Sequence, residues 1–128
     1  MSLSRRTYVL GGHVTKFIGS RHPDFIWKKH PDFGKKENPI LEDYIDEAVN
    51  GALSNTGVSA ESIEKAWIGN FCGELFSNQG HLGAAVVGAN TGLMHKPVMR
   101  VEGACASGGL AFTSAVDSIQ AGTDITMV

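Results

Sequence analysis

Glycine placement constrains this chain more than any other feature of its sequence. Sixteen of its 128 residues are glycine, and nine of them fall within Gly69–Gly109 among small aliphatic residues. Globular proteins average about 7% glycine. These glycines follow no collagen-like period and stand in no serine-rich linker, so they indicate tight turns and close backbone contacts in a packed fold. We expect such roles at Gly103, Gly108 and Gly109, and between Gly80 and Gly88.

Short β-rich runs alternate with helical patterns along the chain. The patterns predict strands at residues 7–10, 66–71, 97–102 and 124–128, a helical turn after Ser59, and helices at 39–56, 77–90 and 110–121. This alternation is typical of an α/β fold with a layered sheet.

Two of these helices carry further signals. In the first, Asn38 is the expected N-cap, with Pro39 at the first helical position and Gly57 just beyond the end. The last helix places Phe112, Val116 and Ile119 on one face and is expected to stop at Gly122.

Residues 21–36 form a separate block, which we interpret as a long ordered loop or insertion. His-Pro-Asp-Phe occurs twice, at residues 22–25 and 30–33, and the block holds five of the eleven Lys and Arg residues. Its prolines and glycine interrupt both helical and strand periodicity. Two interpretations stay open: an anionic-substrate or subunit-contact surface anchored by Phe25, Trp27 and Phe33, or a solvated loop with its aromatic side chains tucked down.

Composition and charge exclude several classes of protein. A net charge of -2 argues against nucleic-acid binding, which needs clustered cations. No apolar run approaches the ~20 residues that a membrane-spanning helix requires. Two cysteines cannot form a disulfide scaffold, which favours a reducing compartment. Because the chain has no Cys-x-x-Cys and no His pair at ligand spacing, we predict no metal site.

Cys105 is the candidate for chemistry, at the turn between a strand and a glycine-padded helix. Such a turn points its side chain away from both elements, and the first N–H groups of the helix can hydrogen-bond an oxyanion. The positive end of the helix dipole favours thiolate over thiol. A cysteine nucleophile also needs a base, usually His. None of the five histidines has a specific spacing to Cys105, although His13, after the first strand, is the best placed.

A free cysteine usually has an ordinary structural role as a small buried apolar side chain. Cys72, directly after the strand ending at Phe71, fits that description, whereas the glycines around Cys105 favour a functional role.

Residues 101–111, Val-Glu-Gly-Ala-Cys-Ala-Ser-Gly-Gly-Leu-Ala, resemble the nucleophile motif of the thiolases, Cys-x-Ser-Gly-Gly. The Glu-Gly-Ala before the cysteine is most similar to sterol-carrier-protein-type thiolase-like proteins. Other segments occur in the order of that family, and the resemblance covers essentially the whole chain. They are Gly11-Gly12, the helix from Pro39, the strand at 66–71, Gln79-Gly80-His81 and residues 118–122.

The resemblance implies the N-terminal half of a thiolase fold, a layered α/β/α arrangement with a mixed sheet, incomplete in this chain. Residues 1–128 would then be a truncated N-terminal thiolase domain in which 21–36 is an insertion. Cys105 would be the nucleophile that carries the acyl group, with its backbone N–H in an oxyanion hole and Ser107 and Gly108 in the supporting helix start. The sequence assigns no substrate-binding residue.

The activity that the resemblance implies is acyl transfer between this cysteine and coenzyme A, by thiolysis of a 3-ketoacyl-CoA or by condensation of acetyl-CoA. Acyl-CoA would be the substrate, with no permanently bound cofactor and no metal. The expected assembly is a homodimer or homotetramer. The expected compartment is the cytoplasm, with the mitochondrial or peroxisomal matrix as the alternative.

The family also uses a His in Gly-His-Pro and a second cysteine in Cys-x-Gly, both expected beyond Val128. We therefore expect an N-terminal fragment that is inactive alone, with the rest of the polypeptide supplying these groups. Two alternatives stay open. One is a β-ketoacyl synthase, whose cysteine is typically followed by Ser-Ser. The other is a non-catalytic homologue that binds acyl-CoA or lipid.

Overall fold

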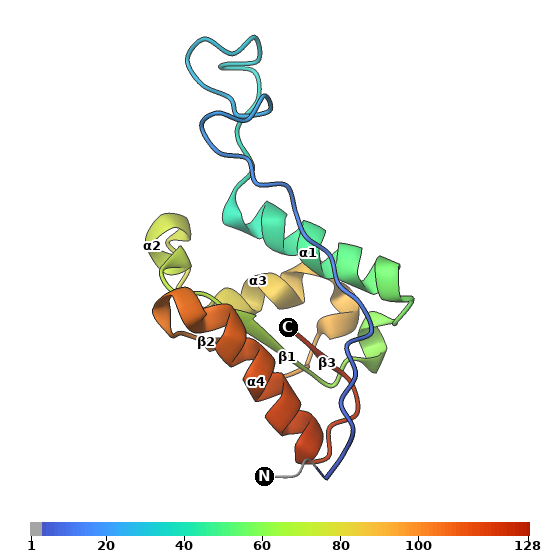
Figure 1. Ribbon diagram of the computed structural model, residues 1–128. Coiled ribbons are helices and arrows are strands. Elements are labelled where there is room, and N and C mark those ends of the chain that lie inside the picture. Colours follow the sequence, from blue (N-terminus) through green and yellow to red (C-terminus); the bar gives the residue numbers. More distant parts are fainter. Residues whose placement is uncertain (1–3) are drawn as a thin grey trace.

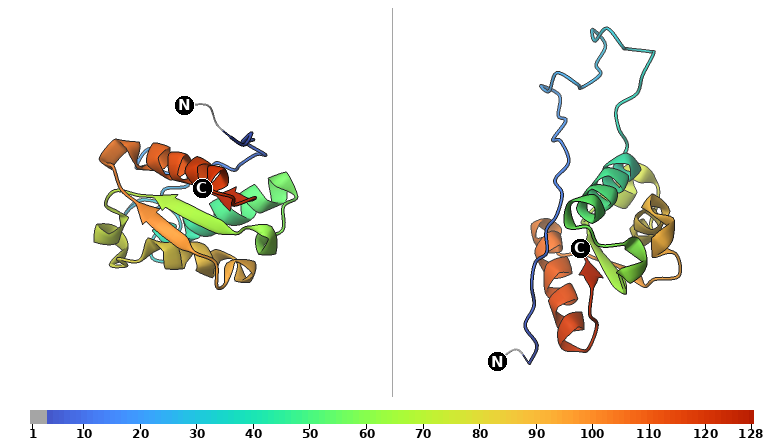
Figure 2. Two further views of the ribbon diagram at one scale, coloured as in Figure 1. Left: turned by 90° about the horizontal axis from the view of Figure 1, so that it is seen from below. Right: turned by 90° about the vertical axis from the view of Figure 1, so that its right-hand side faces the viewer.

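A small parallel sheet lies between two layers of helices in the computed structural model, which describes residues 4–128 (Figure 1). Helix α4 covers one face of the sheet, and α1 and α3 cover the other (Figure 2). The elements are α1 (Leu41–Thr56), η1 (Ala60–Ser62), β1 (Lys65–Gly69), α2 (Gly73–Ser77), α3 (Leu82–Ala89), η2 (Thr91–Leu93), β2 (Val98–Val101), η3 (Ala104–Ala106), α4 (Ser107–Gln120) and β3 (Thr126–Met127). The predicted α/β class is confirmed.

The strand order is β2-β1-β3, with β1 in the centre and parallel to both neighbours. Trp67 is in register with Met99, and Lys65 with Thr126. The antiparallel members of the expected mixed sheet are not among the strands of residues 4–128. The carboxyl ends of β1 and β2 lie at one edge, which is where a parallel α/β sheet places its functional loops.

Successive residues of β1 point to opposite faces, as a strand requires. Ala66, with no exposed surface, belongs to the core beneath α1 and α3, together with Ile45, Val49 and Leu93. Trp67 belongs to a smaller cluster beneath α4. The sheet is therefore buried on both faces.

Helix α1 begins later than predicted. Its N-cap is Ile40, whose N–H donates to the Asp43 carboxylate at 2.9 Å. Asn38 instead exchanges two hydrogen bonds with the Ile26 backbone, at 2.8 and 3.0 Å, so its amide closes a loop and caps no helix. The predicted end is confirmed, because Gly57 adopts φ 69° and donates to the Leu53 carbonyl.

The predicted helix over 77–90 is wrong before Leu82. Asn78 adopts a left-handed φ of 53° and ends α2, and α3 begins only at Leu82. Gly80 and Gly88 have open space where a Cβ would stand. Gly83 fits the expectation of close packing, because a Cβ there would come within 2.8 Å of the Val98 carbonyl oxygen.

The predicted strand at Thr7–Leu10 is extended but pairs with no strand of residues 4–128. Tyr8 and Leu10 remain 70% and 66% exposed. A strand needs a neighbour to take its backbone hydrogen bonds, and the free edge of β3 lies across a groove from this segment. The strand predicted for Thr7–Leu10 is therefore not formed within residues 4–128.

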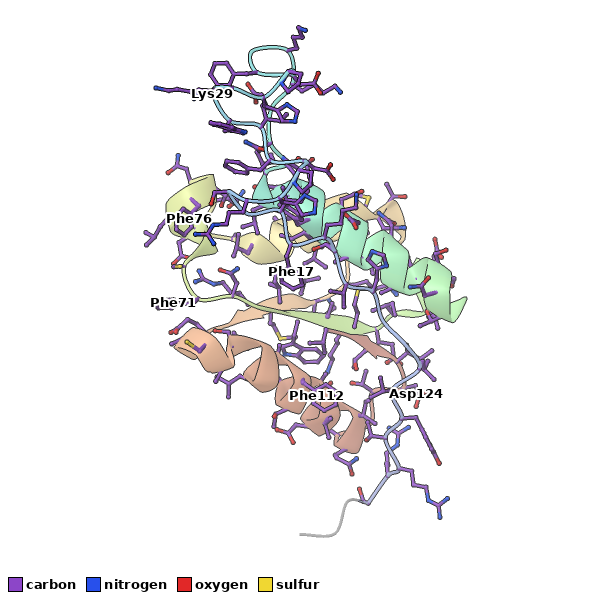
Figure 3. All side chains as sticks on the ribbon, turned by 45° about the horizontal axis from the view of Figure 1, so that its top comes forward. Phe17, Lys29, Phe71, Phe76, Phe112 and Asp124 are labelled. Atoms are coloured by element: carbon purple, nitrogen blue, oxygen red, sulfur yellow. The ribbon has the colours of Figure 1, made fainter. Side chains whose placement is uncertain are left out.

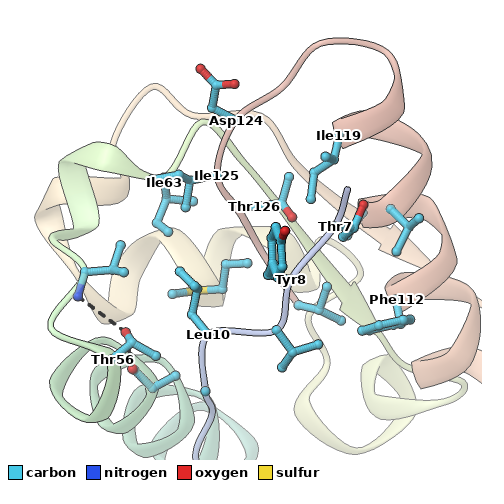
Figure 4. A pocket seen from close by; sticks show the side chains of 18 of the residues that line it. Thr7, Tyr8, Leu10, Thr56, Ile63, Phe112, Ile119, Asp124, Ile125 and Thr126 are labelled. Atoms are coloured by element: carbon cyan, nitrogen blue, oxygen red, sulfur yellow. Dashed lines mark hydrogen bonds between the residues drawn. The ribbon is translucent and has the colours of Figure 1, made fainter. Parts of the chain in front are cut away.

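That groove has a volume of about 500 Å³ and a mostly apolar lining (Figure 4). Its walls are the N-terminal segment, α1, α4 and β3. Phe112, Val116 and Ile119 of α4 line it, Ala111 packs on the sheet, and Ala115 contacts both the sheet and the groove. The large apolar face predicted for this helix therefore lines the groove and leaves the core contact to small residues.

Residues 19–38, which we call the arm, project beyond the start of α1 (Figure 1). The arm consists of turns and contains no helix or strand. Its two His-Pro-Asp-Phe sequences form the same turn. In both, the His Nδ1 accepts from the Asp N–H at 3.1 Å, and the His carbonyl accepts from the Phe N–H at 3.0 Å. The arm is an ordered loop, as expected, and its status as an insertion stays a prediction.

Candidate active site

Cys105 lies in η3, between the end of β2 and the start of α4. Its thiol is free and exposed. The turn therefore presents the side chain to solvent at the carboxyl edge of the sheet, as the sequence predicts for a cysteine at such an elbow. The 14-residue helix α4 begins two residues later, at Ser107.

A buried hydroxyl fixes the backbone of this turn. Ser107, only 4% exposed, donates from Oγ to the Ala104 carbonyl at 2.7 Å and accepts from the Gly103 N–H at 3.0 Å. From the other side, the Glu102 carboxylate accepts from the Ala104 N–H at 2.7 Å. The residues before and after Cys105 are thus held by partners that Cys105 itself does not supply.

The hydrogen bonds that fix this turn hold one of its residues in a strained backbone conformation. Ala104 adopts φ 50°, in the left-handed region that L-residues with a Cβ avoid. Residues held in such regions store about 1–3 kcal/mol each. The hydrogen bonds from Glu102 and Ser107 bracket this residue, so they hold the strained turn that displays Cys105.

One glycine lets α4 start close to the sheet. A Cβ on Gly69, the last residue of β1, would collide with the backbone of Ser107 and Gly108. Gly103 is crowded by the Leu110 side chain, as expected. A Cβ on Gly108 or Gly109 would meet open space, so close packing of their own Cα positions does not explain the support of the turn predicted for these two glycines.

Most of the backbone N–H groups around the Cys105 sulfur already have a hydrogen-bond acceptor, but one does not. The N–H groups of Gly103, Ala104 and Ala106 are all hydrogen-bonded. The Cys105 N–H has no acceptor among residues 4–128. A free N–H beside a nucleophile at the start of a helix is a candidate donor to a developing oxyanion.

The sequence did not predict a second group of interactions at this edge of the sheet, which is centred on Arg100. Arg100 on β2 donates through Nε to the Asn70 carbonyl at 3.1 Å and through its guanidinium to the Phe71 carbonyl. The same guanidinium pairs with Glu74 of α2 at 2.7 Å. A backbone hydrogen bond within Glu74 and the bond from Arg100 hold the pKa of the Glu74 carboxyl below its ordinary value. The sequence does contain a signal for these interactions, because Arg100 is a charged residue within the otherwise apolar run of residues 97–101.

The structure places no histidine on Cys105. His13 Nε2 instead contacts the Glu47 carboxylate at 3.3 Å, beside α1. His22 and His30 use Nδ1 within the arm's own turns, and His81 precedes α3. Within residues 4–128 no side-chain hydrogen bond joins a histidine to Cys105. A base for this thiol is therefore not assigned by the described contacts.

Other predicted features have these outcomes. Cys72 is free and half-buried at the N-cap of α2, so it is less buried than expected. No group of three or more His, Cys, Asp or Glu in residues 4–128 is arranged to hold a metal ion. No helix in that range is long and apolar enough to cross a membrane.

Fold and site define a class: an α/β protein that presents an exposed cysteine from a strand-to-helix turn at the carboxyl edge of a parallel sheet. The family described as thiolase, N-terminal domain, matches residues 32–128. This chain belongs to the thiolase family. The match includes the whole of the sheet, α4 and Cys105, and it begins within the arm.

Two curated relatives carry the name acetyl-CoA acetyltransferase. The protein of Methanothermobacter thermautotrophicus is 37% identical over 82 residues, which is 64% of this chain and 21% of the relative. That of Methanocaldococcus jannaschii is 36% identical over 83 residues, again 64% of this chain and 21% of the relative. The chain thus spans about a fifth of the length of these relatives.

Proposed function

We propose that this chain is the nucleophile-bearing part of a thiolase-type acyltransferase that uses acyl-CoA. The observation that carries the proposal is the exposed Cys105 thiol on a strained, doubly hydrogen-bonded turn at the start of α4. The names of the two curated relatives support coenzyme A as the acyl carrier. The substrate is then a thioester, whose carbonyl a thiolate attacks readily.

In this proposal the Cys105 thiolate attacks the thioester carbonyl and forms a tetrahedral oxyanion. The free Cys105 N–H donates to that oxygen. Collapse breaks the carbon–sulfur bond to coenzyme A, leaves the acyl group on Cys105, and releases a coenzyme A thiolate that takes up a proton. In condensation, a second acetyl-CoA loses a proton from its α-carbon, this carbon attacks the acyl carbonyl, and the Cys105 thiolate leaves. Thiolysis is the reverse: the Cys105 thiolate attacks the 3-keto carbonyl of a 3-ketoacyl-CoA, the bond between C2 and C3 breaks, and acetyl-CoA leaves as its α-carbon takes up a proton. A coenzyme A thiol then gives up its proton and accepts the acyl group from Cys105.

The remaining groups of the reaction belong to the proposal as well. A His base and a second cysteine are supplied from outside residues 4–128, and no resident cofactor or metal takes part. A homodimer or homotetramer is the expected assembly, and the cytoplasm is the expected compartment.

The test is acylation of the full-length polypeptide by acetyl-CoA, followed by mass analysis of its peptides. We expect one added acetyl group on Cys105 and none in Cys105→Ala. Cys72→Ala is the matched control and should keep the label, because Cys72 is the N-cap of α2 and is not part of the turn. Residues 1–128 alone should support no sustained thiolysis.

Two results would overturn the proposal. An unlabelled Cys105, under conditions that acylate a known thiolase, would favour the non-catalytic homologue that binds acyl-CoA or lipid. Condensation that requires an acyl group on a carrier protein in place of coenzyme A would favour a β-ketoacyl synthase.

A further inference from the structure

The carboxyl ends of β1 and β2 lie side by side, and the turn that carries Cys105 follows directly from β2. The backbone ladder between these strands ends where the Asn70 N–H donates to the Val101 carbonyl at 3.1 Å. Beyond that bond, β1 continues into α2, and β2 continues into the Cys105 turn and α4. Contacts that hold the two segments together past this point must therefore come from side chains.

The Arg100 side chain supplies such contacts from β2. Its in-register partner on β1, Ile68, packs on the core beneath α1 and α3, whereas α4 covers the opposite face. The guanidinium donates to the Asn70 and Phe71 carbonyls and pairs with Glu74, and the Arg100 side chain is only 20% exposed. Neither carbonyl has another donor within residues 4–128. One arginine therefore holds the loop after β1 at three points.

This loop begins at the residue that contacts the start of α4. A Cβ on Gly69, the residue before Asn70, would come within 2.4 Å of the Ser107 carbonyl oxygen. The Ser107 hydroxyl makes two of the hydrogen bonds that fix the Cys105 turn. Because the contact between Gly69 and Ser107 leaves no free space, a displacement of the end of β1 moves Ser107 and the turn with it.

We propose that Arg100 is a positioning residue for acyl transfer, which holds the loop after β1 against the end of β2 and thereby sets the position of Ser107 and of the Cys105 thiol and N–H. The inference rests on the proposed function, because it concerns the rate of the same acylation step. The contacts of Arg100 are with two backbone carbonyls and one carboxylate, so it acts through the backbone. A misplacement of about 1 Å at a reacting group can lower a rate about 100-fold.

The test is Arg100→Lys in the full-length polypeptide, which keeps the positive charge but removes the planar fork of donors that reaches all three partners. The rate of acylation of Cys105 is measured by mass at a series of acetyl-CoA concentrations. The maximum rate should fall at least about tenfold, because the turn is misplaced. The acetyl-CoA concentration at half the maximum rate should change less than about twofold, because Arg100 is assigned no contact with the substrate.

Arg5 offers a matched control at the other end of α4. Arg5 donates to two backbone carbonyls, at 2.9 and 3.1 Å, and pairs with the Asp124 carboxylate, so its contacts are of the same kind as those of Arg100. Phe71 and Asp124 lie toward opposite ends of α4 (Figure 3). Arg5→Lys should therefore lower the midpoint of urea denaturation and leave the rate of acylation unchanged.

Glu74→Gln separates the two parts of the Arg100 contact. It keeps both carbonyl contacts and removes only the charge on α2, so it should slow acylation less than Arg100→Lys does. Slower acylation in Glu74→Gln than in Arg100→Lys would contradict the role given to the carbonyl contacts.

Amide exchange reports on the turn without acyl-CoA. The N–H groups of Gly103 and Ala104 are hydrogen-bonded within the turn. Their exchange should quicken at least about tenfold in Arg100→Lys, because local opening exposes them, and should not change in Arg5→Lys.

Three results would contradict the role of Arg100. They are acylation of Arg100→Lys at the wild-type rate, equal slowing in the two lysine variants, and a raised half-saturating acetyl-CoA concentration with an unchanged maximum rate. The last of these would assign Arg100 to substrate binding. A wild-type polypeptide that is never acylated on Cys105 would contradict the proposed function instead, and amide exchange would still decide whether Arg100 holds the turn.

Discussion

The turn at Cys105 and the arm are both short irregular segments, yet they are ordered by different means. The turn is held by a buried serine hydroxyl, a carboxylate and the close approach of α4 to Gly69. The arm is held by hydrogen bonds within its own repeats and by Asn38 at its base. A segment fixed by core contacts can keep a strained residue such as Ala104, whereas a segment fixed only locally can be changed with little effect on the body.

Of the substitutions that test this difference between the turn and the arm, Gly69→Ala should lower the free energy of unfolding most. The added Cβ would collide with the backbone of Ser107 and Gly108, so the start of α4 must move. We expect a loss of about 2–3 kcal/mol in the free energy of unfolding, as for other overpacked sites. Urea denaturation measures the stability, and the rate of acetyl transfer to Cys105 should fall as well.

Gly109→Ala is the control for that experiment. It adds the same methyl group in α4, where nothing lies within 4 Å of the new Cβ. It should be neutral or stabilising by about 0.5–1 kcal/mol, because alanine favours helix. Equal losses in the two variants would mean that the contact between Gly69 and α4 does not position the turn.

Ser107→Ala should have the next largest effect. It leaves the Gly103 N–H without its acceptor and frees the Ala104 carbonyl. An unsatisfied buried group costs about 1–3 kcal/mol, and thermal denaturation measures this loss. Acylation of Cys105 should slow more than stability falls. Ser114→Ala, on the same helix, should change neither quantity, and a similar slowing there would contradict the assignment.

Asn38→Ala tests the arm by the same logic. It removes both hydrogen bonds to the Ile26 backbone, so amide exchange should quicken across the arm. Because this contact is part-buried and local, global stability should fall by less than about 1 kcal/mol. Slower acylation of Cys105 in this variant would show that the arm and the turn are coupled.

The smallest expected effect concerns pH. The hydrogen bond from Lys36 lowers the pKa of the Asp32 carboxyl from its ordinary value of 3.8. A lowered pKa in the folded chain means that the stabilising contact is present above this ordinary value and is lost as pH falls through the folded value. Lys36→Met should raise the midpoint for Asp32 in an NMR titration. Lys35→Met, next to it, should not.

Local signals in the sequence predicted the central part of this fold. Apolar periodicity predicted α1 and β1, and the glycine-padded cysteine predicted the turn at Cys105, because in these places local preference and packing agree. The separation of α2 from α3 was not predicted, since it depends on Asn78 adopting a left-handed conformation. The role of Arg100 was missed for a related reason. Its partners are brought together by the pairing of β2 with β1, which no spacing along the chain reveals.

The apolar groove between the N-terminal segment and β3 has a consequence for handling the protein. It combines a free strand edge with exposed Tyr8, Leu10 and Phe112 side chains. Unpaired edges next to apolar surface template association with other chains. Any preparation that leaves this groove open should aggregate through it in a concentration-dependent way. Solubility is therefore a measure of how well the groove is covered.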